Sequence, residues 1–573
     1  MLALAAVAFA VGAIVGAHAG GSPGDALAAR FVSAWTHGEY AAMYADVDAG
    51  TQSSMSAAQF ASAYEEAART ATTRSARVTG HARGESGGRV SVPVRVSTTL
   101  FGGLSRDYTV PIVESSGGTR VRWSRSLVFP GLQPGELLSR RTTLPQRATV
   151  LARDGSVLAE GPPGSAVASG AGETTRSSPL GEAANAVLGT IGPIPSSRRP
   201  QLEAEGVPRD ALVGLSGLER ALDDRLRGTP GGVLLGGRRV LAVASAHAAP
   251  TVRSSVSPAL QSAAVAALGG QLGGIVVLQP TTGQVLAVAG LGLDGLQPPG
   301  STFKMITLTG VLAAGVANPQ TVFPYATYAT LDGVELHNAN GEECGGSLEL
   351  AFAVSCNSVF TPLGVKLGSA RLVQTAERYG FNHETGIAGA PRSTIPPASQ
   401  IQGELDVGST AIGQGQVLAT PLGMATVAST IADGGRRPRL TFTTETAPGF
   451  VERASSGSVA HTVRRLMIGV VRSGTGTAAD IPGVTVAGKT GTAELKTPCS
   501  ASASASEAGH TESGQEGCQE SEASNTDAWF AAFAPALHPR IAVCVMLVKD
   551  GAGGATAAPL AREVLEAGLR AGL

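Results

Sequence analysis

Ser301 and Lys304 stand three residues apart and are the pair in this chain best suited to nucleophilic chemistry. Residues i and i+3 of a helix lie on one face, so the spacing predicts a helix start at which hydroxyl and amine can touch. Gly300 directly before Ser301 permits a sharp turn. A serine hydroxyl becomes a good nucleophile only when a base takes its proton. The pattern predicts a serine nucleophile with a lysine as its local base.

The use of lysine in the chain strengthens this interpretation. Of the 43 lysines and arginines only five are lysines, and only Lys304 follows a serine by three positions. Arginine keeps its proton near neutral pH, whereas a lysine can lose it. Because most basic residues of this chain are arginines, the lysine at position 304 indicates a site at which the side chain must be able to lose its proton. The alternative that the short pattern leaves open is a solvated lysine on a helix surface.

Two further short motifs carry polar groups suited to such a site. In Ser355-Cys356-Asn357 a hydroxyl can relay a proton, and an amide can both donate and accept hydrogen bonds. In Lys489-Thr490-Gly491 a cation and a hydroxyl can bind a carboxylate, and the glycine leaves room for close approach. The strand-like residues before this motif offer backbone groups to an extended peptide. Each motif alone is weak, because such short patterns are common.

Together the motifs stand in the order Ser-x-x-Lys, Ser-x-Asn, Lys-Thr-Gly, which is the order of penicillin-recognising serine enzymes. On these residues the chain resembles the class B penicillin-binding proteins, the peptidoglycan DD-transpeptidases, of the actinobacterial type with a cone-shaped N-terminal domain. The resemblance extends to the segments 411–415, 419–422 and 528–530 near the motifs, to the dimerisation or pedestal segments 147–158 and 217–228, and to the cone segment 24–132.

The resemblance implies a role for each residue of the three motifs. Ser301 attacks the carbonyl of a D-Ala-D-Ala stem peptide and forms an acyl-enzyme, Lys304 is the base, and Ser355 relays a proton to the leaving group. The amine of a second stem peptide then takes the acyl group, and β-lactams block Ser301 by mimicking the D-Ala-D-Ala amide. The implied substrate-binding residues are Asn357, Lys489, Thr490, Gly491 and Thr492, and the backbone N–H groups of Ser301 and Thr492 form the oxyanion hole.

The order of expected elements predicts an α/β fold class with several domains. In residues 258–573 we expect helices that flank an antiparallel sheet, with a helical subdomain inserted, and the resemblance implies that this is the transpeptidase domain. The resemblance also implies that residues 135–255 form the dimerisation domain, and residues 24–132 are expected to form a small α+β cone. Among the individual strands that we predict are 120–129 in the cone and 484–488 before the third motif.

The first twenty residues predict an export signal. Leu2 to Ala17 are uninterrupted apolar or small residues, slightly fewer than the roughly 20 that span a bilayer. The resemblance implies that residues 1–20 are retained as a single membrane anchor, with the catalytic domain outside the cell membrane. Cleavage near Ala19 is the alternative, because Ala17-His18-Ala19 fits a small-x-small site.

Five cysteines suit an exported protein with one or two disulfides. Cys499 and Cys518 flank an insertion and are one candidate pair; Cys344 and Cys356 are a second, which would brace the loop that carries Ser355. Cys544 is expected to be buried and free. No cysteine or histidine cluster has metal-ligand spacing, so neither a metal nor another cofactor is expected. The net charge of −1 predicts no attraction to nucleic acid.

Two other functions compete with crosslinking of peptidoglycan. One is hydrolysis, as a β-lactamase or carboxypeptidase; the other is a non-catalytic β-lactam sensor or divisome scaffold. The roughly 250 residues before the transpeptidase segment favour cell wall synthesis, because a lactamase needs none. No transglycosylase motif is visible, so a separate glycosyltransferase is an expected partner, with a role in cell division or another stage of wall growth.

Overall fold

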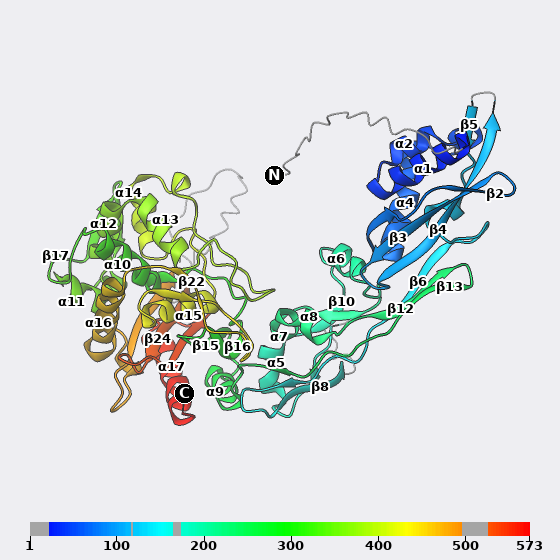
Figure 1. The fold of residues 1–573 in the computed structure, drawn as a ribbon. Coiled ribbons are helices and arrows are strands. Elements are labelled where there is room, and N and C mark those ends of the chain that lie inside the picture. The colour runs from blue at the N-terminus through cyan, green and yellow to red at the C-terminus, as the bar shows by residue number, and fades with distance from the viewer. Residues whose placement is uncertain (1–21, 116–117, 164–172, 495–524, 573) are drawn as a thin grey trace, which may run out of the picture. The chain divides into compact units, whose positions relative to one another are not determined.

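The computed structural model describes residues 22–115, 118–163, 173–494 and 525–572 (Figure 1). Their contacts form two compact units. The predicted domain 135–255 is divided between these units, so the proposed domain boundaries stay predictions. The first unit comprises Met1–Pro145, Ile194–Ala211 and Thr229–His247, and the second comprises Gln146–Pro193, Leu212–Gly228 and Ala248–Leu573.

The first unit packs helices against a curved antiparallel sheet. Its longest helices start at serine caps, and Ser22 and Ser56 each form a capping box with the residue three positions on. The sheet has the order β1-β3-β4-β5, with β2 paired to β3. The elements are α1 (Pro23–His37), α2 (Tyr40–Ala45), α3 (Ala49–Ser54), α4 (Ala57–Ala71), β1 (Thr73–Val78), β2 (Arg83–Glu85), β3 (Arg89–Thr98), β4 (Gly103–Ser115) and β5 (Gly118–Val121).

The predicted strand 120–129 is wrong over most of its length. Strand β5 ends at Val121, and the 3-10 turn η1 (Arg125–Val128) follows. Leu127 and Phe129 are buried there, so the apolar residues that suggested a strand are core residues of a turn. A second sheet in the same unit has the order β13-β12-β6, built from β6 (Leu138–Thr143), β12 (Gly231–Gly236) and β13 (Arg239–Ala244). The unit also contains α6 (Arg199–Ala204).

The second unit is organised around a five-stranded antiparallel sheet with the order β16-β15-β25-β24-β23. Helices α9 and α17 pack on each other and on this sheet, and α15 also packs on it (Figure 1). This arrangement of antiparallel sheet and helices confirms the predicted fold class. The bounds are β15 (Gly273–Gln279), β16 (Gln284–Gly290), β23 (Ala487–Glu494), β24 (Thr526–Ala534), β25 (Ile541–Leu547), α9 (Pro258–Leu268), α15 (Pro421–Ala432) and α17 (Ala557–Arg570).

Strand β23 begins later than the predicted 484–488 strand and carries the whole third motif. Val484 instead bonds back to Ile481 across a tight turn, in which Gly483 has a φ of 78°. A positive φ of this kind favours glycine. The consequence for the site is that Lys489 to Thr492 are all strand residues paired with β24.

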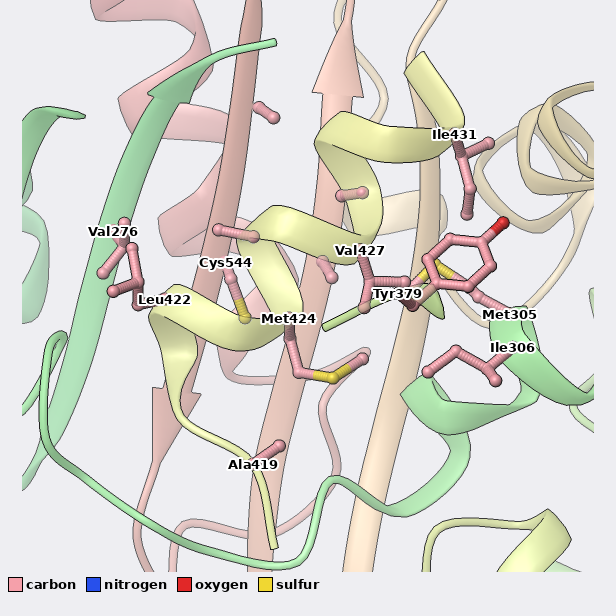
Figure 2. Close-up of a cluster of buried hydrophobic side chains, with 14 of the residues drawn as sticks. Val276, Met305, Ile306, Tyr379, Ala419, Leu422, Met424, Val427, Ile431 and Cys544 are labelled. Carbon is pink, nitrogen blue, oxygen red and sulfur yellow. The ribbon is translucent and has the colours of Figure 1, made fainter. Parts of the chain in front are cut away.

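The core of the second unit joins the sheet to the helix that follows Ser301. Figure 2 shows Leu422 of α15 beside Val276, and Met424 beside Cys544. All four side chains are buried, and Ile306 of α10 (Lys304–Ala313) belongs to the same cluster. Burying side chains of this size stabilises by about 1.5–3 kcal/mol each, so the element that carries Lys304 is fixed against the sheet.

The remaining elements of the second unit are an inserted helical part and the residues nearer the N-terminus. Within the described residues no helix is long and apolar enough to cross a membrane, and the expected anchor, 1–20, lies outside them. The helical part contains α11 (Leu348–Ala353), α12 (Asn357–Leu367), α13 (Ser369–Arg378), α14 (Gly403–Ala411), α16 (Gly457–Ser473), the hairpin β18 (Tyr328–Leu331) and β19 (Val334–His337), and the pairs β17 (Val322–Ala326) with β20 (Cys344–Ser347) and β21 (Arg436–Pro438) with β22 (Phe450–Arg453). The N-terminal part contains β7 (Val150–Leu151), β8 (Val157–Pro163), β9 (Arg176–Ser177), β10 (Ile191–Pro193), β11 (Leu212–Gly214), β14 (Val252–Arg253), α5 (Glu182–Leu188), α7 (Gly217–Ala221) and α8 (Asp223–Leu226).

Candidate active site

Ser301 lies in a 3-10 turn, η2 (Gly300–Phe303), directly before α10. The predicted helix start is therefore a tighter turn at its first residues. Gly300 has a φ of 50° and donates its N–H to the Gly413 carbonyl at 3.0 Å. A Cβ at Gly300 would lie 2.6 Å from the Thr492 carbonyl oxygen, so only glycine lets the turn approach β23 this closely.

Lys304 is fully buried and points its amine at the second motif. Its Nζ donates to the Ser355 carbonyl and to Asn357 Oδ1, both at 2.6 Å, and lies 3.3 Å from Ser355 Oγ. Within the described residues no hydrogen bond joins this amine to the Ser301 hydroxyl. The structure thus brings Lys304 to Ser355 and Asn357, while the predicted direct contact with Ser301 is not a hydrogen bond in this state.

Lys489 reaches the same hydroxyl from the sheet. Its side chain is also fully buried, and its Nζ donates to Ser355 Oγ at 2.8 Å and to the Thr490 carbonyl at 2.9 Å. Ser355 Oγ therefore lies between two lysine amines. Residues from the three separate motifs meet around this oxygen.

Burial lowers the pKa of both lysines. The pKa of Lys304 falls well below its usual value, mainly because burial disfavours the charged amine and further because Lys489 lies nearby. Burial lowers the pKa of Lys489 to about 7. Part of the apolar wall is aromatic: Lys304 Nζ lies 5.5 Å from the ring centre of Phe360, and Lys489 Nζ lies 5.7 Å from that of Phe352.

Ser355 occupies a strained position between α11 and α12. Its φ of 63° is in the left-handed region, which a non-glycine residue rarely adopts. The next residue, Cys356, bonds through its N–H to the Ala351 carbonyl at 2.8 Å and forms a disulfide with Cys344. This confirms the second candidate pair. The disulfide holds the loop whose conformation presents the Ser355 hydroxyl to both amines.

The other cysteine predictions have different outcomes. Cys544 is buried and free, as predicted. Cys499 and Cys518 lie outside the described residues, and their pairing stays a prediction. In the part of the chain that the structure describes, no three histidine, cysteine or acidic side chains are grouped to hold a metal ion. The predicted lack of a metal or cofactor is an expectation still to be tested.

Asn357 links the site to a neighbouring hairpin. While its Oδ1 accepts from Lys304, its Nδ2 donates to the backbone carbonyl of His337 in β19 at 2.8 Å. Both ends of the amide are thereby used within the protein. In this state Asn357 orients Lys304; its predicted contact with a substrate amide remains a proposal.

The third motif is held from two sides. A Cβ at Gly491 would lie 2.8 Å from the Pro299 carbonyl oxygen and 2.9 Å from Thr302 Cγ2. The Ser301 turn therefore packs against Gly491 where a side chain would otherwise lie, and the role of Gly491 in substrate binding stays a prediction. Thr490 Oγ1 lies 2.5 Å from Thr475 Oγ1. Thr492 is half-buried on β23.

Sequence reasoning missed Thr475 and the two phenylalanines. Thr475 donates its N–H to the Ala353 carbonyl at 3.1 Å and so ties the end of α11 to Thr490. The only signal for it was the short run of small residues Ser473-Gly474-Thr475-Gly476 before the third motif. Phe352 and Phe360 flank the second motif. In the sequence they look like ordinary core residues, and their spacing does not indicate that their rings lie near the two amines.

Family comparisons agree with this geometry. Residues 273–566 match the model described as the penicillin binding protein transpeptidase domain, which is more than half of the chain. This chain belongs to the penicillin-binding protein transpeptidase family. Residues 168–236 match the penicillin-binding protein dimerisation domain, and residues 23–136 match the NTF2-like N-terminal transpeptidase domain. The resemblance to a class B protein with a cone-like N-terminal domain is thereby confirmed.

Among curated proteins, the chain is 33% identical over 384 residues to the peptidoglycan D,D-transpeptidase PbpA of Mycobacterium tuberculosis, a match that covers 56% of this chain and 72% of PbpA. It is 32% identical to the PbpA of Mycolicibacterium smegmatis, over 62% of this chain and 80% of that protein. Among solved structures, a ceftriaxone acyl-enzyme complex of the Mycobacterium tuberculosis protein is 27% identical, with a TM-score of 0.56, covering 74% of this chain and 98% of the other.

Proposed function

We infer that this protein is a serine DD-transpeptidase that crosslinks peptidoglycan stem peptides through an acyl-enzyme on Ser301 and is acylated by β-lactams. The observation that carries the inference is the meeting of the Lys304 and Lys489 amines at Ser355 Oγ. Relatives named peptidoglycan D,D-transpeptidases, and a related structure with a bound antibiotic, support the same reaction.

In the proposed acylation, Lys304 acts as a neutral amine. Its two N–H groups donate to the Ser355 carbonyl and Asn357 Oδ1, which leaves its lone pair for a hydroxyl proton. Ser301 Oγ attacks the D-Ala carbonyl carbon as its proton passes to Lys304. The C–N bond then breaks, and the departing nitrogen takes a proton through Ser355. The base and the relay are adjacent because Ser355 Oγ lies 3.3 Å from the Lys304 amine.

Substrate binding is assigned to the edge strand β23. The backbone N–H groups of Ser301 and Thr492 would stabilise the oxyanion, each donor contributing about 3–4 kcal/mol in the transition state. A protonated Lys489, with the hydroxyls of Thr490 and Thr492, would bind the terminal carboxylate. The close approach of Gly300 to Thr492 supports this assignment, since it brings the turn and the strand together.

The setting of the enzyme is also part of the proposal. We place the catalytic domain outside the cell membrane, held by an N-terminal anchor, and working with a separate glycosyltransferase in wall synthesis during growth or division. The matches to dimerisation and NTF2-like domains support this placement, because these domains accompany transpeptidases of the same family.

Labelling with a fluorescent penicillin, followed by peptide mapping, tests the assignment. The adduct is expected on Ser301, and Ser301→Ala is expected to abolish labelling. Ser458→Ala, which removes an exposed hydroxyl at the start of α16, is the matched control and should label normally. Loss of the adduct within minutes would favour a β-lactamase, and full rescue of growth by Ser301→Ala would favour a scaffold.

A further inference from the structure

The β18–β19 hairpin beside the second motif has one buried face and one exposed face. Side chains alternate across a strand, so residues two apart share a face. Leu331 is buried and Leu336 half-buried on one side, whereas Tyr328, Glu335 and His337 are exposed on the other. The exposed face is therefore a surface of polar and aromatic groups carried on a fixed support.

Its three exposed side chains form one cluster. Tyr328 and His337 are directly opposed across the hairpin, with ring centres 5.3 Å apart. His337 Nε2 lies 3.2 Å from Glu335 Oε2, and these two side chains are 56% and 49% exposed. When Nε2 of a histidine donates to a carboxylate, the other ring nitrogen, Nδ1, can act as an acceptor. The cluster thus combines a carboxylate, an aromatic ring and a proton acceptor.

The cluster adjoins the site through the backbone. The His337 carbonyl accepts from Asn357 Nδ2, and the same amide bonds to Lys304. The surrounding sequence is strongly one-sided in charge: residues 305–365 contain no lysine or arginine, and their five acidic residues are Asp332, Glu335, Glu342, Glu343 and Glu349. This stretch of the chain, which includes the hairpin, therefore offers carboxylates and no lysine or arginine of its own to a cationic group.

We propose that the outer face of the β18–β19 hairpin binds the cationic acceptor amine of the second stem peptide, and that His337 receives its proton. The proposal rests on the DD-transpeptidase function. The ammonium loses one proton to Nδ1 of His337, and the neutral nitrogen attacks the acyl carbon on Ser301. The C–N bond forms, the C–Oγ bond breaks, and the second nitrogen-bound proton reaches Ser301 Oγ through Ser355 and Lys304. His337 then returns its proton to solvent.

The groups on the hairpin suit an ammonium for stated reasons. Glu335 supplies an opposite charge, and the Tyr328 ring adds a cation–π contact of about 0.5–1 kcal/mol at an exposed site. An aliphatic ammonium keeps its proton near neutral pH, with a pKa of about 10.4, and cannot attack until it is lost. The acceptor nitrogen must therefore lose two protons in all, one before it attacks and one as the C–Oγ bond breaks.

The test compares acyl transfer with acylation in the full chain. A thioester acyl donor is supplied with Nα-acetyl-lysine amide, whose side chain carries the acceptor amine, and the ratio of amide product to hydrolysed product is measured. His337→Gln is expected to lower this ratio more than tenfold, and Glu335→Gln severalfold, while acylation falls less than threefold. Both variants keep the His337 carbonyl, so the hydrogen bond from Asn357 is preserved.

The controls separate this proposal from the function on which it rests. His383→Gln and Glu384→Gln remove an exposed histidine and glutamate elsewhere in the same unit and should leave the ratio unchanged. An unchanged ratio in His337→Gln, or an equal fall in acylation and transfer, would overturn the acceptor assignment. A wild-type enzyme that is acylated but passes nothing to the amine would instead overturn the transpeptidase function.

Discussion

Two groups of charged residues are buried in the second unit, and they follow opposite rules. In the active site, Lys304 and Lys489 are buried together, and among the residues that the structure describes no carboxylate is a hydrogen-bond partner of either amine. In the segments that precede the transpeptidase sheet, Arg147 and Arg176 are buried around Glu219. The first group contains like charges, whereas the second is built from opposite charges.

The arginine group satisfies its charges within the protein. Glu219 accepts from Arg147 at 2.6 Å and from Arg176 at 2.7 Å, and its side chain is 1% exposed. Arg147 also lies 2.8 Å from Asp223, and Arg176 donates to the Ala148 carbonyl at 2.8 Å. Arginine stays charged when buried, so this network can bind segments together but cannot exchange protons.

Within the described part of the chain, the two buried lysines, Lys304 and Lys489, are not paired with an opposite charge in this way and can exchange protons. Burial without an opposite charge lowers both pKa values, so the amines can change protonation near neutral pH. This has a cost in stability: the unfolded chain binds protons that the folded chain does not. The free energy of unfolding contributed by Lys489 therefore rises with pH between about 7 and its unfolded pKa, roughly 10.4. The buried arginines, which have carboxylate partners, therefore stabilise the fold, whereas the buried lysines, which have none among the described residues, are available for proton transfer.

Removing the active-site base should have the largest effect. Lys304→Met is expected to slow penicillin acylation about a thousandfold, within the range of general-base contributions. Removing the buried amine relieves its desolvation, which offsets the two hydrogen bonds that it donates, so the free energy of unfolding should change by less than about 1 kcal/mol. Acylation kinetics and denaturant unfolding measure the two quantities, and the exposed Lys366→Met is the matched control. Acylation at the wild-type rate would show that Lys304 is not the base.

Removing the centre of the arginine network should have the opposite profile. Glu219→Gln leaves two buried arginines with one charge partner fewer and is expected to lower the free energy of unfolding by about 3–5 kcal/mol. The exposed pair of Arg225 and Glu445 provides the control: Glu445→Gln should cost less than about 1 kcal/mol. Acylation per folded molecule should stay near wild type; a selective loss of acylation would contradict a structural role.

The disulfide tests how far the Ser355 conformation depends on its support. Changing Cys344 and Cys356 together to serine opens a loop with a sequence separation of 12, and we expect a loss of about 3 kcal/mol in unfolding free energy. Acylation should fall about tenfold, because the strained Ser355 loses part of its support. Thermal unfolding and acylation rates measure both effects. Unchanged acylation in the folded variant would mean that α11 and α12 alone hold the loop.

The sequence predicted the lysines but not the network that contrasts with them. Nucleophile and base must be specific residue types, so Ser301, Lys304 and Lys489 are visible as motifs and in their order. Arg147 and Glu219 are 72 positions apart, and their segments read as plain structure, because any arginine and glutamate can form a surface pair. Likewise Phe352 and Phe360 gain meaning only when folding places their rings beside the amines. Burial is the property that short patterns do not show.

The smallest and most informative effect is the pH dependence of acylation. Lys304 must be neutral to act as base, so the rate should rise with pH through its lowered pKa. Lys489 must be charged to bind a carboxylate, so the rate should fall above its pKa of about 7, by roughly tenfold for each further pH unit. A thioester acyl donor without a carboxylate should lose only the alkaline fall. In Lys489→Arg the alkaline fall should disappear, because arginine keeps its charge. If the rate falls equally at alkaline pH for both donors, the group that loses its proton there is not Lys489. Lys304 would then be the only buried lysine whose protonation is tied to catalysis, in contrast to the charged arginine network.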